Sequence, residues 1–195
     1  ATLNVSDDAG NTATDTVTVI VEDTTVPTAD AGSNQTVEAG TQLTLNASNS
    51  TDNVGIDTYE WEFGDNGTGN GVSPTHTYND TGTYPVTLTV TDGAGNNATD
   101  TVTIAVEDTT APTADAGANQ TVPNGTSVKF NGTASTDTVG ITSYEWSFDD
   151  GTTTTNATPT HTYDSPGTYT ATLNVSDDAG NTATDTVTVI VEDTT

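Results

Sequence analysis

Carboxylate side chains recur at matched positions of this sequence, and they are the residues best suited to bind a ligand. Asp52 and Asp137 lie in Ser-Thr-Asp loops, whereas Asp92 and Asp177 open turns of the pattern Asp-x-x-Gly-Asn. Carboxylates gathered at one end of a domain repel one another unless a hard cation joins them, and Ca²⁺ prefers oxygen ligands of this kind. Solvated surface acid is the alternative interpretation, because the whole chain is acidic.

Two further carboxylate motifs lie where successive repeats meet. Glu-Asp pairs at 22–23, 107–108 and 192–193 precede Thr-Thr, and the first two are followed by x-Pro-Thr-Ala-Asp. In a β-sandwich this linker and both Asp loops can converge at one end, which adds linker carboxylates to the candidate site. No organic cofactor is expected. The candidate calcium ligands are therefore Asp52, Asp92, Asp108, Asp115, Asp137 and Asp177.

The two histidines, His76 and His161, each lie in a Pro-Thr-His-Thr-Tyr motif. A catalytic histidine needs a nucleophile and an orienting acid, and neither motif has a recognisable elbow or triad pattern nearby. Two histidines in separate domains also cannot build a conventional zinc site. The chain has no Cys, which excludes disulfides and thiolate chemistry. We therefore expect structural histidines, no catalytic residue and no enzyme activity.

Asn-x-Ser/Thr sequons form the second functional signal. Twelve occur among 17 Asn, and none has Pro at its middle position. They favour an exported glycoprotein with N-linked glycans on exposed loops and outer faces. Alternatively, Thr-rich strands and Asn-rich turns generate sequons without selection. The candidate sites are Asn4, Asn34, Asn46, Asn49, Asn66, Asn79, Asn97, Asn119, Asn124, Asn131, Asn156 and Asn174.

The charge balance excludes several classes of partner. The chain carries 28 Asp and Glu against a single basic residue, for a net charge of −27. Sequence-independent nucleic-acid binding needs Lys and Arg to neutralise phosphates, and docking on anionic lipid needs them too. The longest apolar run is far too short for direct membrane insertion. In composition, the near-absence of Lys and Arg resembles proteins of extreme halophiles, including acidic haloarchaeal surface glycoproteins.

The chain repeats with a period of 85 residues. We expect one module at residues 26–110 (module one) and another at 111–195 (module two), with residues 1–25 as the last two strands of a preceding module. Residues 1–25 are identical to 171–195 but differ at seven positions from 86–110. This favours a true period of 170, formed by alternating module types, and a chain cut from a longer array. The missing strands of residues 1–25 would come from upstream sequence or from a neighbouring copy.

Alternating apolar and polar residues predict short β-strands, and no segment shows helical periodicity. Turn sequences rich in Asp, Asn and Gly separate the alternating runs. Several short strands in about 85 residues around one Trp favour an all-β, immunoglobulin-like sandwich. Tyr59, Trp61 and Phe63 share one strand face, which predicts core packing; an aromatic platform for sugars is the alternative. Other alternating runs contain Leu43 and Leu45; Tyr84, Val86, Leu88 and Val90; and Val102, Ile104 and Val106.

Four motifs in order resemble the PKD (polycystic kidney disease) domain. They are Tyr-Glu-Trp-Glu-Phe-Gly-Asp at 59–65, Pro-Thr-His-Thr-Tyr at 74–78, Gly-Thr-Tyr-Pro-Val-Thr-Leu-Thr-Val at 82–90, and Asp92 with Gly95-Asn96. Module two repeats the first three at 144–151, 159–163 and 167–169. The resemblance implies seven-strand sandwiches of extracellular arrays, adhesins, surface layers and enzyme accessory regions, which bind or space other components. The turn at 64–67 departs from the tighter turn usual in the family, so a different turn geometry is expected there.

The resemblance also bears on the cation site. Some PKD-like modules bind calcium in this region, which implies roles for Asp52, Asp92, Asp137 and Asp177. The usual Asp-x-Asp-Gly loop is replaced here by Asp-Asn-Val-Gly and Asp-Thr-Val-Gly.

These observations predict a segment of an extracellular or cell-surface PKD array that acts as a rod, stalk or filament. Its partners would be adjacent modules, other copies of itself and N-linked glycans. Pro27 and Pro112 would restrain the linkers through their fixed φ. The alternative function is an adhesion module, or a carbohydrate- or protein-binding accessory module of a secreted hydrolase.

Overall fold

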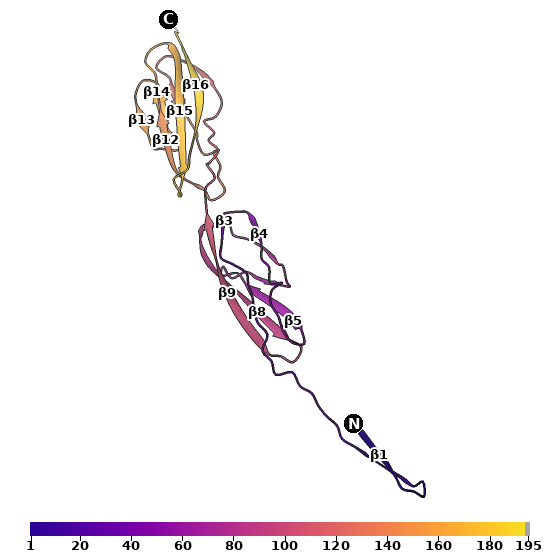
Figure 1. The fold of residues 1–195 in the computed structure, drawn as a ribbon. Helices are drawn as coiled ribbons and strands as arrows, with labels where there is room; N and C mark the ends of the chain where they lie inside the picture. Colours follow the sequence, from indigo (N-terminus) through magenta and orange to yellow (C-terminus); the bar gives the residue numbers. More distant parts are fainter. Residues whose placement is uncertain (194–195) are drawn as a thin grey trace.

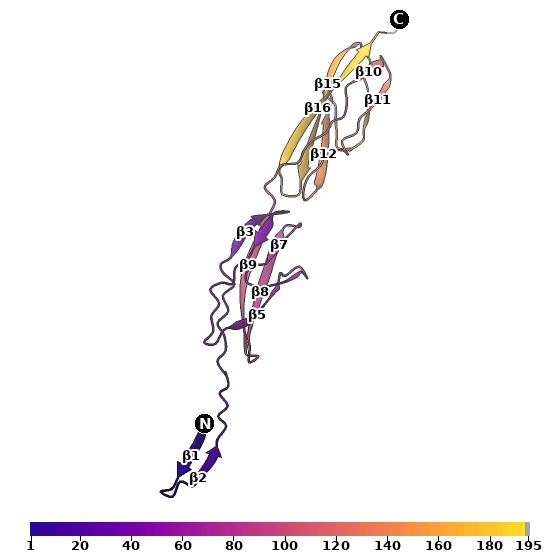
Figure 2. The same ribbon diagram turned by 90° about the vertical axis from the view of Figure 1, so that its right-hand side faces the viewer.

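The computed structural model describes residues 1–193, and its three β-structured units lie end to end in a line (Figures 1 and 2). An N-terminal hairpin is followed by module one and then by module two. Within the described residues there is no helix long and apolar enough to cross a membrane. The all-β prediction is confirmed.

Module one is a seven-strand sandwich. Its larger sheet has the order β3-β9-β8-β5-β6, and β4 pairs with β7 in the smaller sheet. Strand β3 runs parallel to β9, and the other pairings are antiparallel. The strands are β3 (Gln35–Glu38), β4 (Gln42–Thr44), β5 (Ile56–Glu62), β6 (Thr68–Asn70), β7 (Thr75–Thr77), β8 (Gly82–Asp92) and β9 (Asn97–Glu107).

Module two repeats this topology. Its larger sheet has the order β10-β16-β15-β12-β13, and β11 pairs with β14. The strands are β10 (Gln120–Pro123), β11 (Ser127–Lys129), β12 (Ile141–Ser147), β13 (Thr153–Thr154), β14 (Thr160–Thr162), β15 (Gly167–Asp177) and β16 (Thr182–Glu192).

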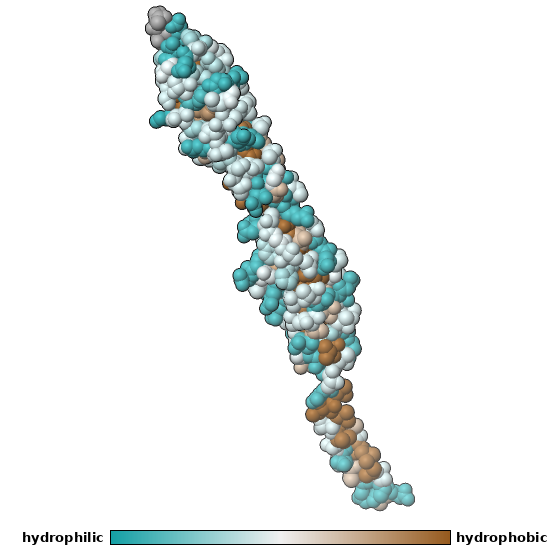
Figure 3. Space-filling model, turned by 90° about the vertical axis from the view of Figure 1, so that its left-hand side faces the viewer, coloured by the Kyte–Doolittle hydropathy of each residue, from teal (hydrophilic) through white to brown (hydrophobic). Residues whose placement is uncertain are grey.

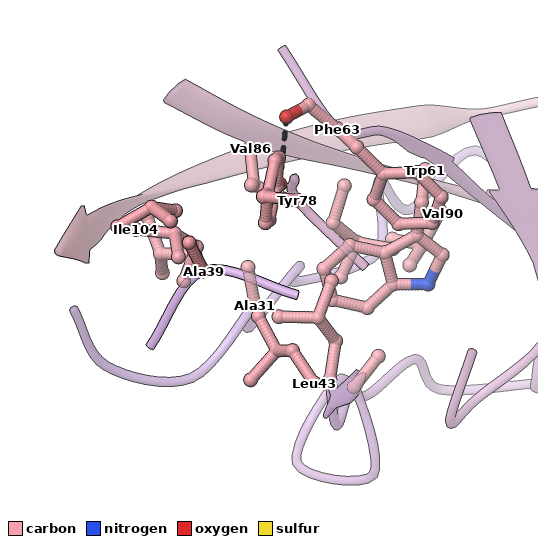
Figure 4. Packing of buried hydrophobic residues seen from close by; sticks show 14 residues of the cluster. Ala31, Ala39, Leu43, Trp61, Phe63, Tyr78, Val86, Val90 and Ile104 are labelled. Carbon is pink, nitrogen blue, oxygen red and sulfur yellow. Dashed lines mark hydrogen bonds between the residues drawn. The ribbon is translucent and has the colours of Figure 1, made fainter. Parts of the chain in front are cut away.

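The alternating residues form the core between the two sheets of each module, and Figure 4 shows the core of module one. Trp61 is 1% exposed and Phe63 is 2% exposed. The hydroxyl of Tyr78 donates to the carbonyl oxygen of Phe63 at 2.7 Å, which satisfies a polar group inside the core. Trp146 is likewise buried in module two. Core packing is therefore confirmed, and the interpretation of these aromatics as an exposed sugar platform is wrong.

The turn after β5 differs between the two modules, as expected from its sequence: Gly64 has a φ of 83°, whereas its counterpart Asp149 does not have a positive φ. Asn66 has a φ of 73°, and Gly151, which occupies the same place in module two, has a φ of 88°. Both turns contain the same closing hydrogen bond, from Phe63 N to Gly67 O and from Phe148 N to Thr152 O, and module two adds a second one from Gly151 N to Phe148 O. Asn tolerates the left-handed region better than most residues, so it substitutes for Gly here.

The N-terminal hairpin consists of β1 (Thr2–Ser6) and β2 (Thr12–Thr16). Its pairing of Thr2 with Thr16 matches that of Thr172 with Thr186 in module two, so identical sequence gives identical register. In module two, β16 continues to Glu192 because 187–191 pair with 167–171. Strand β2 ends at Thr16 because no strand among residues 1–193 lies beside residues 18–21.

Candidate metal centre at the module junctions

Three acidic side chains from three separate segments meet where the linker enters module two. Asp108 follows β9 in the linker, Asp137 lies in the loop before β12, and Asp177 ends β15. One carboxylate oxygen of each lies within 4.8 Å of the other two. Asp108 and Asp177 are buried, with exposed fractions of 7% and 4%. The arrangement recurs where residues 22–26 enter module one, with Asp23, Asp52 and Asp92.

A single asparagine connects the turn carboxylate to the linker. The side-chain amide of Asn181 donates to Asp177 Oδ2 at 2.9 Å and to the Asp108 carbonyl oxygen at 3.3 Å. Its backbone N–H donates to Asp177 Oδ1 at 2.9 Å. Asn96 makes the equivalent contacts with Asp92 and with the Asp23 carbonyl oxygen. The Asp-x-x-Gly-Asn turn therefore fixes both the turn carboxylate and the linker backbone.

The other two carboxylates are each held by one oxygen. Asp137 Oδ2 accepts the backbone N–H groups of Val139 and Gly140 at 2.8 and 2.9 Å. Asp108 Oδ1 accepts the N–H of Thr110 at 3.2 Å. Asp137 Oδ1 and Asp108 Oδ2 are buried and have no hydrogen-bond partner. Buried polar atoms are normally paired, so these two oxygens are suited to a cation.

The electrostatics of the cluster favour added positive charge. Burial raises the pKa of Asp108, and the neighbouring charges of Asp137 and Asp177 raise it further, against a lowering by the Thr110 hydrogen bond. Burial also acts on Asp177, but hydrogen bonds from Asn181 outweigh it and lower the pKa of that carboxyl. A bound divalent cation would relieve the repulsion and desolvation that disfavour ionised Asp108.

The linker is also fixed to module one. The carboxylate of Glu38 accepts the Thr109 N–H at 2.9 Å and the Thr109 hydroxyl at 2.7 Å. It also accepts the Thr110 hydroxyl at 2.9 Å. These hydrogen bonds, those from Thr109 first, lower the pKa of Glu38 to about 2. Across the junction, the half-buried Val139 of module two packs against the core of module one. Asp108 is therefore held by contacts with both modules.

Five of the six carboxylates chosen from the sequence lie in the two clusters. Asp115 lies outside them: its Oδ1 accepts the N–H of Gly117 at 2.8 Å, so it caps a local turn. Sequence reasoning placed Asp23 at a module end but did not choose it as a ligand. The signal was available, because Asp23 lies 85 residues before Asp108. Whether the clusters bind calcium stays a prediction.

The histidines have structural surroundings. His76 stacks on Phe63 with ring centroids 4.1 Å apart and bonds Asp65 through Nε2 at 2.7 Å. In module two, His161 stacks on Phe148 at 4.2 Å and bonds Asp150 at 2.6 Å. Each ring thus joins β7 or β14 to the turn that follows β5 or β12, and its carboxylate partner also accepts a backbone N–H of that turn.

Ten of the twelve sequon asparagines are exposed. Asn124 and Asn174 are half-buried, and Asn174 Oδ1 is a buried atom without a hydrogen-bond partner. Side-chain access therefore permits glycan attachment at most of the candidate positions.

Both modules match one known protein family, and curated relatives contain similar segments. Residues 24–106 and 109–191 each match the family described as PKD domain. A microbial collagenase of Vibrio alginolyticus is 45% identical over 82 residues, covering 42% of this chain and 10% of the collagenase. Chitinase A1 of Niallia circulans is 35% identical over 138 residues, covering 66% of this chain and 20% of the chitinase.

A solved structure, the PKD1 domain of the Vibrio cholerae metalloprotease PrtV, is 35% identical. The match covers 44% of this chain and all of that domain, with a TM-score of 0.37. The chain thus spans no more than a fifth of the length of the two enzymes named above. PKD domains are non-catalytic accessory modules that occur in secreted and extracellular proteins. With two successive matches that together cover most of its length, the chain belongs to the PKD domain family.

Proposed function

We propose that this chain is a structural segment of an extracellular PKD array, a rod or stalk whose module junctions are stiffened by calcium. The observation that carries the proposal is the linker carboxylate Asp108, which faces Asp137 and Asp177 of module two with a buried, unpaired oxygen. A cation bound there would join the linker to two loops of the following module. Bending at the linker would then require those ligands to separate.

Calcium fits the chemistry of the ligands better than softer metals. All three side chains offer carboxylate oxygens, and the cluster contains neither Cys nor His. Ca²⁺ accepts six to eight oxygen ligands in flexible geometry, and water can supply those that the protein does not. Repetition of the cluster at both module entrances means that each linker would be stiffened in the same way.

Thermal unfolding in calcium and in chelator tests this proposal. At constant ionic strength, excess Ca²⁺ is expected to raise the Tm, because a ligand that binds only the folded state stabilises it by about 2.7 kcal/mol at 100 times its Kd. Magnesium at the same ionic strength controls for general screening of the −27 net charge. An unchanged Tm in chelator contradicts a calcium-stiffened junction.

We also propose that exposed sequons carry N-linked glycans in the native protein. The exposure of ten of the twelve asparagines supports this, since the acceptor amide must be accessible. Intact-mass measurement of native material tests it. A mass equal to that of the bare polypeptide would reject it.

The alternative function is an accessory module of a secreted hydrolase. The similarity to a collagenase and a chitinase favours it. Sugar binding through stacked tryptophans is disfavoured, because Trp61 and Trp146 are both buried. Co-sedimentation with insoluble collagen and chitin separates the two functions: retention on either polymer favours the accessory module, and none is expected for a structural rod.

A further inference from the structure

The N-terminal hairpin exposes an apolar face whose counterpart in module two is buried. In residues 1–21 five apolar side chains are 51–90% exposed, whereas the identical residues of module two are 0–3% exposed. Figure 3 shows the resulting hydrophobic atoms gathered on the thin N-terminal end of the molecule. The pairs are Leu3 and Leu173, Val5 and Val175, Val17 and Val187, Val19 and Val189, and Val21 and Val191.

Module two shows what covers this face when it is covered. The core around Leu173 and Val175 is completed by side chains from residues 111–170, including Phe130 and Trp146. Strand β12 pairs along one edge of β15, and β10 runs parallel to β16 along the other. The N-H of Ala116 also donates to Asp185 Oδ2, which corresponds to Asp15 of the hairpin. The same sequence in the same register presents the same pairing groups and apolar face in residues 1–21.

The exposure of Val54 is a second, separate observation that supports a docking partner for the hairpin. Val139 of module two is half-buried and packs against the core of module one, which precedes it. Val54, the equivalent residue of module one, is 76% exposed. The hairpin alone does not cover Val54, although a complete module in that position would, as module one covers Val139.

We infer that residues 1–25 are a docking element for one specific partner, a polypeptide segment with the sequence of residues 111–170, and that the two together form a complete module of the second type. The segment supplies the remaining five strands, pairs along both edges of the hairpin and covers Val54. This inference goes beyond the proposed rod and does not depend on cation binding.

Core volume makes the hairpin specific for this segment over the corresponding part of module one. Ala1 corresponds to the buried Ala171 in module two but to the buried Val86 in module one. Val19 corresponds to Val189 in module two but to Ile104 in module one, and both of these are 0% exposed. Docking on residues 26–85 would therefore leave the space of three carbon atoms unfilled. At about 0.8 kcal/mol per buried methylene, this weakens association on the order of 50-fold.

A second copy of the intact chain is a poor partner. Its own 111–170 segment is already completed by residues 171–195, which are identical to the hairpin. If the hairpin of one copy replaced residues 171–195 of another, one of the two identical sequences would become buried and the other exposed, so no additional apolar surface would be buried. We therefore expect the chain alone to remain monomeric in sedimentation velocity as its concentration rises.

A covalent extension tests the inference. A polypeptide with residues 111–170 placed directly before Ala1 of the full chain should fold a third module. Limited proteolysis is expected to cleave the hairpin in the unextended chain and to leave it intact in the extended chain. The added tryptophan should be inaccessible to quencher. A hairpin that is still cleaved, an added tryptophan that is quenched, or an aggregated product would overturn the inference.

Two substitutions and one exchange give the controls. In the extended chain, Val5→Asp should restore cleavage, whereas Thr14→Asp should not, because Thr184, its counterpart, is exposed. Extension with residues 26–85 should lower the equilibrium constant for hairpin docking on the order of 50-fold. Equal protection by both segments would refute the stated specificity. A concentration-dependent dimer of the unextended chain that Val5→Asp abolishes would assign the face to a second copy instead.

Discussion

Two leucines 170 residues apart provide a matched pair for testing the packing in depth. Leu173 is 0% exposed in module two, and Leu3, with the same sequence on both sides, is 63% exposed in the hairpin. Leu→Ala at a fully buried site costs about 3 kcal/mol, from lost transfer free energy and the remaining cavity. In a module of this size this corresponds to a Tm lower by roughly 12–24 °C. Leu3→Ala should change the Tm by about 1 °C or less, because its side chain already contacts water.

The assay must isolate module two, because a chain with several domains does not unfold in one two-state step. Each module has one tryptophan, Trp61 in module one and Trp146 in module two. A Trp61→Phe background leaves Trp146 as the sole fluorescence reporter of module two. Thermal and denaturant unfolding of Leu3→Ala and Leu173→Ala in this background give the two free-energy differences.

Two results would contradict this description of the packing. A Leu173→Ala cost below about 1 kcal/mol would mean that β15 is not packed in the core as described. A Leu3→Ala cost that approaches that of Leu173→Ala would mean that the hairpin face packs against module two instead of lying exposed.

The remaining predictions concern charge. In calcium, Asp137→Asn should at least halve the rise in Tm that the ion produces, whereas Asp115→Asn should leave it unchanged; calorimetry in calcium and chelator measures both, and equal effects would count against the cluster. Burial raises the pKa of Asp150, but hydrogen bonds from Thr152 and His161 outweigh it and hold the pKa below its ordinary value. A carboxyl group whose pKa is lower in the folded state stabilises the fold at pH values above its unfolded pKa. This contribution is lost as the pH falls through the folded pKa, so the free energy of unfolding of module two should decrease below about pH 4. Asp150→Asn should reduce this loss of stability at low pH, measured by denaturant unfolding of module two over a series of pH values. The same loss in the variant would contradict a lowered pKa for Asp150. Raising NaCl from 0.1 to 2 M should increase the Tm by screening the −27 net charge, and a falling Tm would argue against repulsion as a limit on stability.

Most of the fold could be predicted from the sequence, because alternating apolar residues and turn motifs are local patterns that recur in both modules. Alternation at Val86, Leu88 and Val90 identifies a strand with one buried face, and the structure shows all three at 0% exposure. The departure of the turn at 64–67 was also predictable, because Gly64 allows a positive φ that its counterpart Asp149 does not adopt. The sequence did not show that Asn66 would adopt the positive φ that Gly151 has in module two.

The candidate site depends on contacts that the sequence specifies less directly. The grouping of Asp137 with Asp177 follows from the loops of one sandwich end, but excluding Asp115 required its hydrogen bond to Gly117. The role of Glu38 in holding the linker was not predicted, since its partner Thr109 lies 71 residues away and on another segment. Exposure of Val54 beside the burial of Val139 likewise depends on which module precedes each one.

The most direct test of the calcium-stiffened junction is the relative alignment of the two modules in solution. Residual dipolar couplings measured for each module report its alignment separately, in calcium and in chelator at the same ionic strength. A calcium-stiffened junction should give one shared alignment tensor in calcium and two different tensors in chelator, because Asp108 would no longer be joined through a cation to Asp137 and Asp177. Tensors that are the same in both conditions would contradict it.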